Sequence, residues 1–463
     1  MNTDPDLIVV GGGNAALCAA ISAARLGAKV TVLETAPKTY RGGNSRHTRN
    51  FRVSHQGPLG VLEETYDEQE FYEDLLKVTK GKTDPELAKA CIAASPEAYG
   101  WMEQQGIRFQ ASLSGTLSLS RTNAFFLGGG KALVNALYRT AEDLGITILY
   151  ETDVHAIEMR QARVTRLVAT SGGQEMRFTP KALVVASGGF QANLEWLREA
   201  WGPGAENFLI RGTPYNRGAV LKALLDQGCE SVGDPTQCHA VAIDGRAPKF
   251  DGGIVTRLDC VPFSVVLNKA GKRFYDEGED VWPKRYAIWG RLVAAQPDQI
   301  AYAIIDSRSA NLFMPSVFPP EKADTIEELV AKLGLPQDQA LKTIAEFNAA
   351  CRNDLSAFSP QELDGLGTQG LEINKTNWAR PLAEPPFLAY ALRPGVTFTY
   401  LGLKVDGAAR VQTDQGPAEN LWAAGEIMAG SILGQGYLAG FGMTIGTVFG
   451  RRAGQSAGTY VRG

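Results

Sequence analysis

The chain has 463 residues, and 51 of them are glycine, against the roughly 7 per cent of an average protein. Its 46 basic and 50 acidic residues give a formal net charge of −4, so no basic excess marks it as a nucleic-acid-binding protein. No apolar run reaches the ~18 residues that span a bilayer, and the first residues, MNTDPD, lack the basic and apolar regions of a signal peptide. We therefore expect a cytoplasmic protein.

Cysteine and histidine are too few and too scattered to predict a metal site. The chain has 6 cysteines without a CxxC pair, and only 4 histidines. Iron–sulfur clusters and zinc sites need such ligands at short, regular spacing. We expect no bound metal.

The first 34 residues predict a nucleotide-binding βαβ unit. Leu7–Val10 is a short apolar run typical of a buried parallel strand, an alanine-rich helix follows, and Lys29–Leu33 predicts a second strand. The loop between strand and helix fits GxGxxG/A, and Glu34 ends the second strand about 20 residues later, where a carboxylate can bind ribose hydroxyls. The motif and its neighbours supply Gly11, Gly13, Asn14, Ala15 and Ala16.

Later glycine-rich turns favour FAD over NAD as the nucleotide. Gly42–Ser45 follows Glu34 too early to be a third strand, and its small residues suit the close passage of a large flat cofactor. Two further apolar runs, 182–186 and 421–424, end in glycine at Gly188 and Gly425. A polar loop and plain tight turns are the alternative readings.

The middle of the chain predicts an inserted second domain. From about 233 to 376 the sequence is rich in charge, proline and aromatic residues, and 325–333 and 338–351 have the apolar spacing of amphipathic helices. We expect a discontinuous first domain, 1–232 with 377–463, and a capping domain, 233–376.

The C-terminal segment carries glycine at every fourth residue from Gly442 to Gly458. On a helix this spacing produces one bare stripe. A membrane-spanning helix is excluded because Arg451 and Arg452 interrupt the stripe. We expect a helix packed tightly against the first βαβ unit and under the cofactor, with its N-terminus towards the flavin.

Together these motifs resemble the FAD-dependent fumarate reductase and succinate dehydrogenase flavoprotein superfamily over nearly the whole chain. The marks are 8–16, 42–45, 128–130, 186–190, 271–274 and 423–426, in that order. The resemblance implies an α/β fold of this type: a Rossmann-like FAD-binding domain with an inserted α+β domain that caps the isoalloxazine. It also implies hydride exchange at flavin N5 paired with proton transfer on the adjacent carbon.

The resemblance also implies roles for individual residues around FAD. Glu34 and Glu426 match the two ribose-binding acids, and Val154 matches the residue whose backbone meets the adenine. The remaining cofactor-binding candidates, from the glycine-rich loops, are Gly43, Asn44, Ser45, Gly130, Gly188, Gly189, Gly425 and Leu438.

The expected active site departs from fumarate reductase. The usual histidine pair after Pro394-Gly395 is replaced by Thr397 and Phe398, and Tyr437 stands where an arginine is usual. We expect Arg285 or Tyr437 to move the proton, although arginine is effectively always protonated. The expected substrate-binding residues are His239, Arg257, Arg393, Thr397 and Tyr400.

Within the superfamily, the whole chain is most similar to the tricarballylate dehydrogenase branch, particularly at residues 45–50 and 275–289. This similarity implies oxidation of propane-1,2,3-tricarboxylate to cis-aconitate. Other di- or tricarboxylates remain alternatives. Tyr437 with Thr444–Gly446 resembles the ketosteroid dehydrogenase branch, so a 3-ketosteroid is another. The lost histidine pair also leaves open a non-catalytic electron-transfer or assembly component.

Two expectations concern the flavin itself. His47 lies about two places from the histidine that carries covalent FAD in membrane-bound relatives, so we expect non-covalent FAD. Because the chain has no cluster-binding motif, reduced flavin needs a separate electron acceptor. The resemblance implies a membrane-associated iron–sulfur protein, which would hold the chain at the inner face of the cell membrane. Direct reaction with oxygen is the alternative.

Overall fold

The computed structural model describes residues 5–112 and 119–463. The signal-peptide argument rests partly on residues 1–4, which lie outside this range. The N-terminal βαβ prediction is confirmed: β1 (Leu7–Val10), α1 (Asn14–Arg25) and β2 (Val30–Leu33) follow one another, and β1 pairs in parallel with β2. Every residue of β1 is buried, as expected for the central strand of a sheet covered on both faces.

The first sheet joins strands that are far apart in the sequence. Its order is β20-β21-β10-β1-β2-β6, and its pairs are parallel except for β20 with β21. The two later glycine-ended runs are therefore both strands of this sheet: β10 pairs with β1, and β21 pairs with β10. The additional strands are β6 (Thr147–Leu149), β10 (Ala182–Val185), β20 (Arg410–Thr413) and β21 (Gly416–Ala423).

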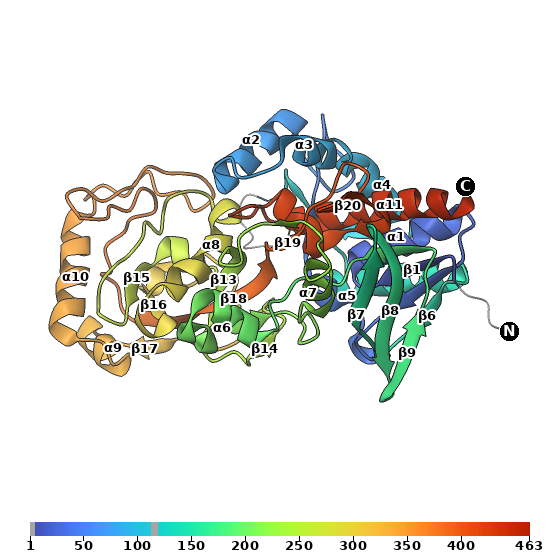
Figure 1. Cartoon of the computed structure of the whole chain (residues 1–463). Coiled ribbons are helices and arrows are strands. Elements are labelled where there is room, and N and C mark those ends of the chain that lie inside the picture. The colour runs from blue at the N-terminus through green and yellow to red at the C-terminus, as the bar shows by residue number, and fades with distance from the viewer. Residues whose placement is uncertain (1–4, 113–118) are drawn as a thin grey trace.

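Two smaller sheets and several helices complete this part of the molecule (Figure 1). The antiparallel sheets are β3-β5-β4 and β7-β8-β9. Their strands are β3 (Asn50–Arg52), β4 (Phe109–Gln110), β5 (Asn123–Phe126), β7 (Thr152–Arg160), β8 (Arg163–Ser171) and β9 (Gln174–Phe178). The helices are α2 (Glu68–Thr79), α3 (Pro85–Ala93), α4 (Ser95–Gln104), α5 (Gly129–Asp143) and α7 (Ala219–Leu225).

The second sheet is built on β18 (Phe387–Thr399), the longest strand of that sheet. It contains β11 (Leu209–Arg211), β13 (Cys238–Asp244), β14 (Phe250–Asp251), β15 (Val265–Asn268), β16 (Ala301–Ile305) and β17 (Glu321–Ala323). The sheet therefore extends beyond the expected segment 233–376 at both ends, because β11 precedes that segment and β18 follows it. A further pair, β12 (Ser231–Val232) with β19 (Gly402–Leu403), is antiparallel.

The helices of the second sheet include the two amphipathic helices expected from the sequence. They form as α9 (Ile326–Lys332) and α10 (Gln337–Ala350), which lie at the end of the molecule away from both chain termini (Figure 1). The other two helices of this region are α6 (Leu194–Trp201) and α8 (Trp282–Ala294).

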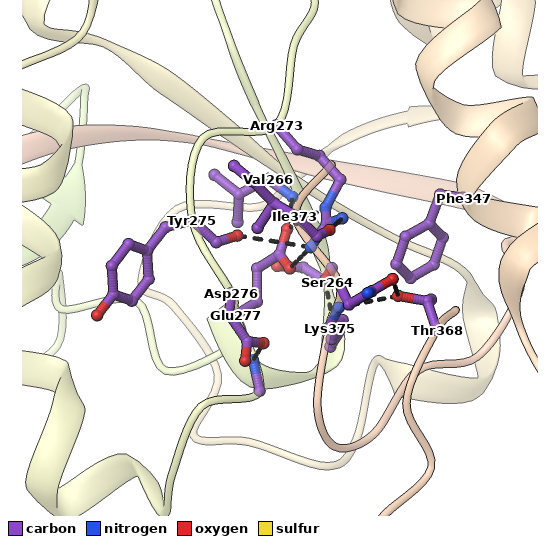
Figure 2. A network of polar contacts seen from close by, with 12 residues as sticks. Ser264, Val266, Arg273, Tyr275, Asp276, Glu277, Phe347, Thr368, Ile373 and Lys375 are labelled. Carbon is purple, nitrogen blue, oxygen red and sulfur yellow. Dashed lines mark hydrogen bonds and ion pairs between the residues drawn. The ribbon is translucent and has the colours of Figure 1, made fainter. Parts of the chain in front are cut away.

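A buried ionic network fixes the segment that leads into α8. Arg273 donates to both Glu277 oxygens, at 3.0 and 2.5 Å, and the backbone N–H of Val266 donates to the same carboxylate at 3.0 Å. Beside this pair, the Lys375 ammonium donates to the Ser264 carbonyl at 2.8 Å (Figure 2). Burial lowers the pKa of Lys375 to about 8. Glu277 is thus buried and held by Arg273 and Val266.

The C-terminal glycine stripe forms the packing face of α11 (Phe441–Arg462), as expected. This helix lies along α1, and glycines of α11 meet alanines of α1 four residues apart. A Cβ atom added at Gly450 would lie 2.5 Å from the Ala15 carbonyl oxygen, and one added at Gly454 would lie 2.1 Å from that of Ala19. The two helix backbones therefore touch directly, and only glycine fits.

We predict that Gly454→Val lowers the free energy of unfolding by about 3 kcal/mol or more, because overpacking forces the two backbones apart. The control is Gly100→Ala in α4, where an added Cβ meets no atom within 4 Å. This change should raise the free energy of unfolding by about 0.5 kcal/mol or more, since alanine is the better helix former. Chemical denaturation of both variants tests the prediction. Equal stability of Gly454→Val and the unmodified chain would contradict the packing described.

Candidate functional site

One cavity of about 470 Å³ lies between the two sheets. Its lining comes from the loops after β1, β2 and β10, and from β13, β18 and α8. A volume of this size, at the junction of two structural units, is typical of a cofactor or ligand site. The lining residues form two groups. The loops after β1, β2 and β10 form what we call the nucleotide end, and Arg49, Arg211 and Arg257 mark the cationic end.

The loop after β1 approaches its neighbours so closely that side chains are excluded. Gly11 has φ +112°, and a Cβ there would lie 2.3 Å from the Ala186 carbonyl oxygen. A Cβ at Gly12 would lie 2.0 Å from Glu34 Oε2. Gly11, Gly13, Asn14 and Ala15 all line the cavity, whereas Ala16 is fully buried and serves the packing of α1.

Glu34 presents an unsatisfied oxygen to the cavity. The side chain is buried, and its Oε1 accepts from the backbone N–H of Ala36 at 2.9 Å. Among the described residues, Oε2 has no hydrogen-bond partner. Burial raises the pKa of the Glu34 carboxyl. A buried acceptor without a partner fits a ribose hydroxyl of a bound nucleotide. Val154, expected at the adenine, also lines this end.

The 42–45 turn bridges the two ends of the cavity. Asn44 accepts from the backbone N–H of Thr213 at 2.9 Å and donates to the Thr397 carbonyl at 2.7 Å, so it joins the nucleotide loop to β18. Gly43 and Ser45 line the cavity beside it. Gly130 does not line it; a Cβ there would lie 2.2 Å from the Ser45 carbonyl oxygen, so this glycine supports the turn from behind.

Glu426 occupies a second enclosed position. Its Oε1 accepts from the backbone N–H of Thr399 at 2.9 Å, and burial raises the pKa of its carboxyl to about 7. Gly188 and Gly425 line the cavity with it. Gly189 packs against Glu426, since a Cβ there would lie 2.4 Å from Glu426 Oε1, and Leu438 is fully buried outside the lining.

At the cationic end, His239 and Tyr437 stack face to face. Their ring centroids are 3.9 Å apart, with an interplanar angle of 13°. Neither ring nitrogen of His239 has a partner among the described residues. Burial, followed by the charges of Arg211 and Arg257, lowers the pKa of His239 well below its ordinary value, so the ring is neutral. A neutral buried imidazole with free nitrogens can donate to one ligand atom and accept from another.

Tyr437 faces the start of α11. Its hydroxyl accepts from the backbone N–H of Gly442 at 3.0 Å, in the first turn of that helix. Burial raises the pKa of Tyr437 above its ordinary value. The amide and the positive end of the helix dipole favour a negative oxygen at this position and partly oppose the effect of burial.

A β-bulge brings two successive residues of β18 to the cavity. His239 pairs with Phe398 and Ala240 pairs with Val396, so Thr397 is the extra residue. Successive residues of a regular strand face opposite sides of the sheet. Thr397 and Phe398 nevertheless both line the cavity, because the bulge interrupts that alternation.

Arg257 lines the cavity and forms an ion pair with Asp259. Its Nε and Nη2 donate to the two oxygens of Asp259 at 2.6 and 2.5 Å, and Trp282 Nε1 donates to the same carboxylate at 2.8 Å. Burial alone would raise the pKa of Asp259, but the charge and hydrogen bonds of Arg257 outweigh burial and hold that pKa below its ordinary value.

Sequence reasoning missed several residues at this end. Arg49, Arg211, Asp259, Trp282 and Tyr286 all line the cavity. Arg49 lies in the 45–50 segment that carried the family resemblance, so a signal for it existed. Arg211 lies in β11, outside the expected cap domain, and carried no local motif.

Three predicted catalytic or substrate-binding residues do not line the cavity. Arg285 points to Glu279, at 2.9 Å, and Arg393 donates to the Gln299 carbonyl at 3.1 Å. Tyr400 is fully buried, and its hydroxyl donates to the Gly436 carbonyl. The structure thus brings together His239, Arg257, Thr397 and Tyr437 from the expected set, and leaves Arg285, Arg393 and Tyr400 outside.

Two further properties concern metals and membranes. In residues 5–112 and 119–463, no group of three or more His, Cys, Asp or Glu side chains is arranged to hold a metal ion. Within the same ranges, no helix is both long enough and apolar enough to cross a membrane.

The FAD binding domain family matches residues 6–442, and the chain belongs to this family. FAD is therefore its cofactor, and the unpaired Glu34 oxygen and the glycine-lined cradle fit that group. The resemblance to the fumarate reductase flavoproteins is confirmed at the level of the superfamily and the fold.

Curated relatives match nearly the whole chain at low identity. NADH:fumarate oxidoreductase of Klebsiella pneumoniae (strain 342) is 27% identical over 99% of this chain and 48% of its own length. NADH:acrylate oxidoreductase of Vibrio harveyi is 26% identical over 98% and 50%. The chain thus spans about half the length of these two relatives. Urocanate reductase of Eggerthella lenta is 24% identical over 99% and 75%.

Solved structures share the fold. The open conformation of a flavocytochrome c3 fumarate reductase superposes with a TM-score of 0.75 at 20% identity, covering 99% of this chain and 79% of the other. A 3-ketosteroid-Δ4-(5α)-dehydrogenase from Rhodococcus jostii RHA1 gives a TM-score of 0.74 at 22% identity, covering 99% and 97%.

Proposed function

We propose that the chain is a flavin-dependent oxidoreductase acting on the CH–CH bond of a small polycarboxylate, and that this substrate is tricarballylate, oxidised to cis-aconitate. One observation carries the proposal: a single cavity has FAD-binding loops at one end and a cluster of arginines at the other. Guanidinium groups bind carboxylates through paired, charge-assisted hydrogen bonds. The narrower choice of tricarballylate rests on the resemblance of residues 45–50 and 275–289.

The relatives support the general class. Fumarate, acrylate and urocanate, which appear in the names of three relatives, are all unsaturated carboxylates. A carboxylate next to the reacting carbons acidifies the proton that is removed in oxidation or added in reduction. The same cavity would serve either direction.

Bound FAD supplies the hydride acceptor, and the chain supplies the proton transfer. Tyr437 is the preferred proton-transfer group, because it lines the cavity and its hydroxyl oxygen accepts from the Gly442 N–H. In oxidation the phenolate removes the proton next to a carboxylate; in reduction the phenol returns it. Arg285 is the less favoured candidate, since it faces Glu279 outside the cavity lining.

The remaining expected residues have binding roles in this proposal. His239 and Thr397 donate to the substrate from β13 and β18, and Arg257 offers N–H groups not used by Asp259. Reduced flavin passes its electrons to a separate acceptor, such as a membrane-associated iron–sulfur protein. Arg393 and Tyr400 have no part in the substrate contacts.

We predict that anaerobic addition of tricarballylate bleaches the oxidised flavin band of the holoenzyme near 450 nm, a wavelength that the family resemblance implies. Succinate, a 3-ketosteroid and buffer alone are the comparison additions. We expect the largest and fastest change with tricarballylate, because the cationic end favours the most highly charged acid. Bleaching by the steroid alone would replace the polycarboxylate proposal, and no bleaching by any acid would remove it.

We predict that Tyr437→Phe lowers the turnover number by about 100-fold or more, as loss of a general acid–base group does. Burial raises the pKa of Tyr437 above its ordinary value near 10. The phenolate fraction is therefore small at neutral pH and still grows as the pH approaches 10. The oxidation rate of the unmodified enzyme should therefore rise between about pH 7 and pH 10. Stopped-flow reduction across that range tests both statements. A variant with unchanged rate and pH profile would exclude Tyr437.

We predict that acid precipitation releases all of the FAD into the supernatant, since we propose non-covalent attachment. His47 lines the cavity, but it lies two positions beyond Ser45, displaced from the family's attachment position. Burial lowers the pKa of His47 to about 4. Absorbance of the redissolved pellet near 450 nm, the flavin band, measures any retained flavin. Flavin in the pellet would show a covalent link.

A further inference from the structure

Two arginines in the cavity have no acidic partner. Among the described residues, neither Arg49 nor Arg211 has a carboxylate within salt-bridge distance. Within the part of the chain that the structure describes, the Arg49 side chain makes one hydrogen bond, to the Met314 sulfur at 3.4 Å, and sulfur is a weak acceptor. Arg211 donates from Nε to the Gly253 carbonyl at 3.0 Å and from Nη1 to Thr397 Oγ1 at 3.2 Å, so its Nη2 is unused.

Arg257 differs from these two because Asp259 neutralises it. The pair uses Nε and Nη2 of Arg257, and both side chains are almost fully enclosed. His239 is neutral and adds no charge. The cationic end therefore carries two uncompensated positive charges, on Arg49 and Arg211.

Such an arrangement is unfavourable without a ligand. A buried charge is normally paired, because removing it from water is costly. Burial lowers the pKa of Arg49 to about 9 and that of Arg211 to about 10, and the charge of Arg257 is the next cause for both. The three guanidinium groups are thus close enough to repel one another, and a bound anion would relieve that repulsion.

We propose that Arg49 and Arg211 are the specificity-determining residues of this site, each binding one carboxylate of the substrate, while Arg257, held by Asp259, offers its free Nη1 to a third. This inference rests on the proposed function, since it takes the substrate to be a polycarboxylate. Arg49 lies in the 45–50 segment that carries the family resemblance, whereas Arg211 lies in no motif. A site with two full positive charges and one neutralised arginine should bind tricarboxylates and dicarboxylates more tightly than monocarboxylates.

Anaerobic binding to the holoenzyme with its flavin chemically reduced tests the inference without turnover, because reduced flavin cannot accept a hydride from tricarballylate. Tricarballylate, glutarate (the same chain without the central carboxylate) and butyrate are titrated while the flavin absorption spectrum and calorimetric heat are recorded. The expected order of affinity is tricarballylate, then glutarate, with butyrate far weaker. We expect Arg49→Met and Arg211→Met each to weaken tricarballylate binding by about 100-fold, as for the loss of one buried charge-assisted contact. The matched control, Arg198→Met, removes an exposed arginine that pairs with Glu206 and should change affinity less than twofold.

Two additional variants guard against misfolding. Arg49→Lys and Arg211→Lys keep the positive charge but lose the planar guanidinium that donates two parallel hydrogen bonds. We therefore expect each to weaken binding by only about tenfold.

A further variant tests the role of Asp259. Asp259→Asn should tighten tricarballylate binding several-fold, because it frees the charge of Arg257. Methionine variants that bind like the unmodified protein, or an Asp259→Asn variant that binds more weakly, would overturn the inference.

The outcome separates this inference from the proposed function. If the arginine variants lose tricarballylate binding but no acid bleaches the flavin, the carboxylate site stands and the proposed reaction falls. If tricarballylate bleaches the flavin and the variants bind it normally, the reaction stands and the two arginines are excluded. Failure of the unmodified holoenzyme to bind any polycarboxylate would remove both.

Discussion

The direct backbone contact between α1 and α11 is the constraint on which the rest of the molecule depends. Gly450 and Gly454 of α11 sit against Ala15 and Ala19 of α1 with no room for a Cβ atom. The same contact fixes the position of the α11 N-terminus beside the start of α1, where Asn14 donates to Thr447 at 2.9 Å. The nucleotide loop and the amide that meets Tyr437 are thereby set by one helix pair.

Much of the FAD-binding half could be predicted because its signals are local. The run Leu7–Val10, the glycines that follow it and Glu34 lie within one βαβ unit, and their spacing alone reports strand, turn and helix. The glycine stripe from Gly442 to Gly458 was equally readable, since its period matches a helix. Because these elements approach one another closely, glycine and alanine occupy the contact positions, and their regular spacing can be recognised in the sequence.

The cationic end could not be read in the same way, because its residues come from distant segments. Arg49 precedes β3, Arg211 ends β11 and Asp259 lies between β14 and β15, so they meet only in the assembled fold, and no short motif reports that meeting. The family comparison directed attention to Arg285 and Arg393, which the fold turns to Glu279 and to a backbone carbonyl. Positions aligned by motif order do not specify which way a side chain faces.

The bulge in β18 divides one strand into two phases. Before Thr397 the strand keeps the alternation of the second sheet; after it, Thr399 meets Glu426 on the cofactor side. One extra residue therefore shifts the alternation of side chains along β18. The shift separates the part of the strand that belongs to the second sheet from the part that meets the flavin-binding loops. Thr397 and Phe398 face the cavity at the bulge, while Thr399, one residue further on, keeps its contact with Glu426. A strand built in this way allows the residues that face the substrate to change without displacing the residues that hold the cofactor.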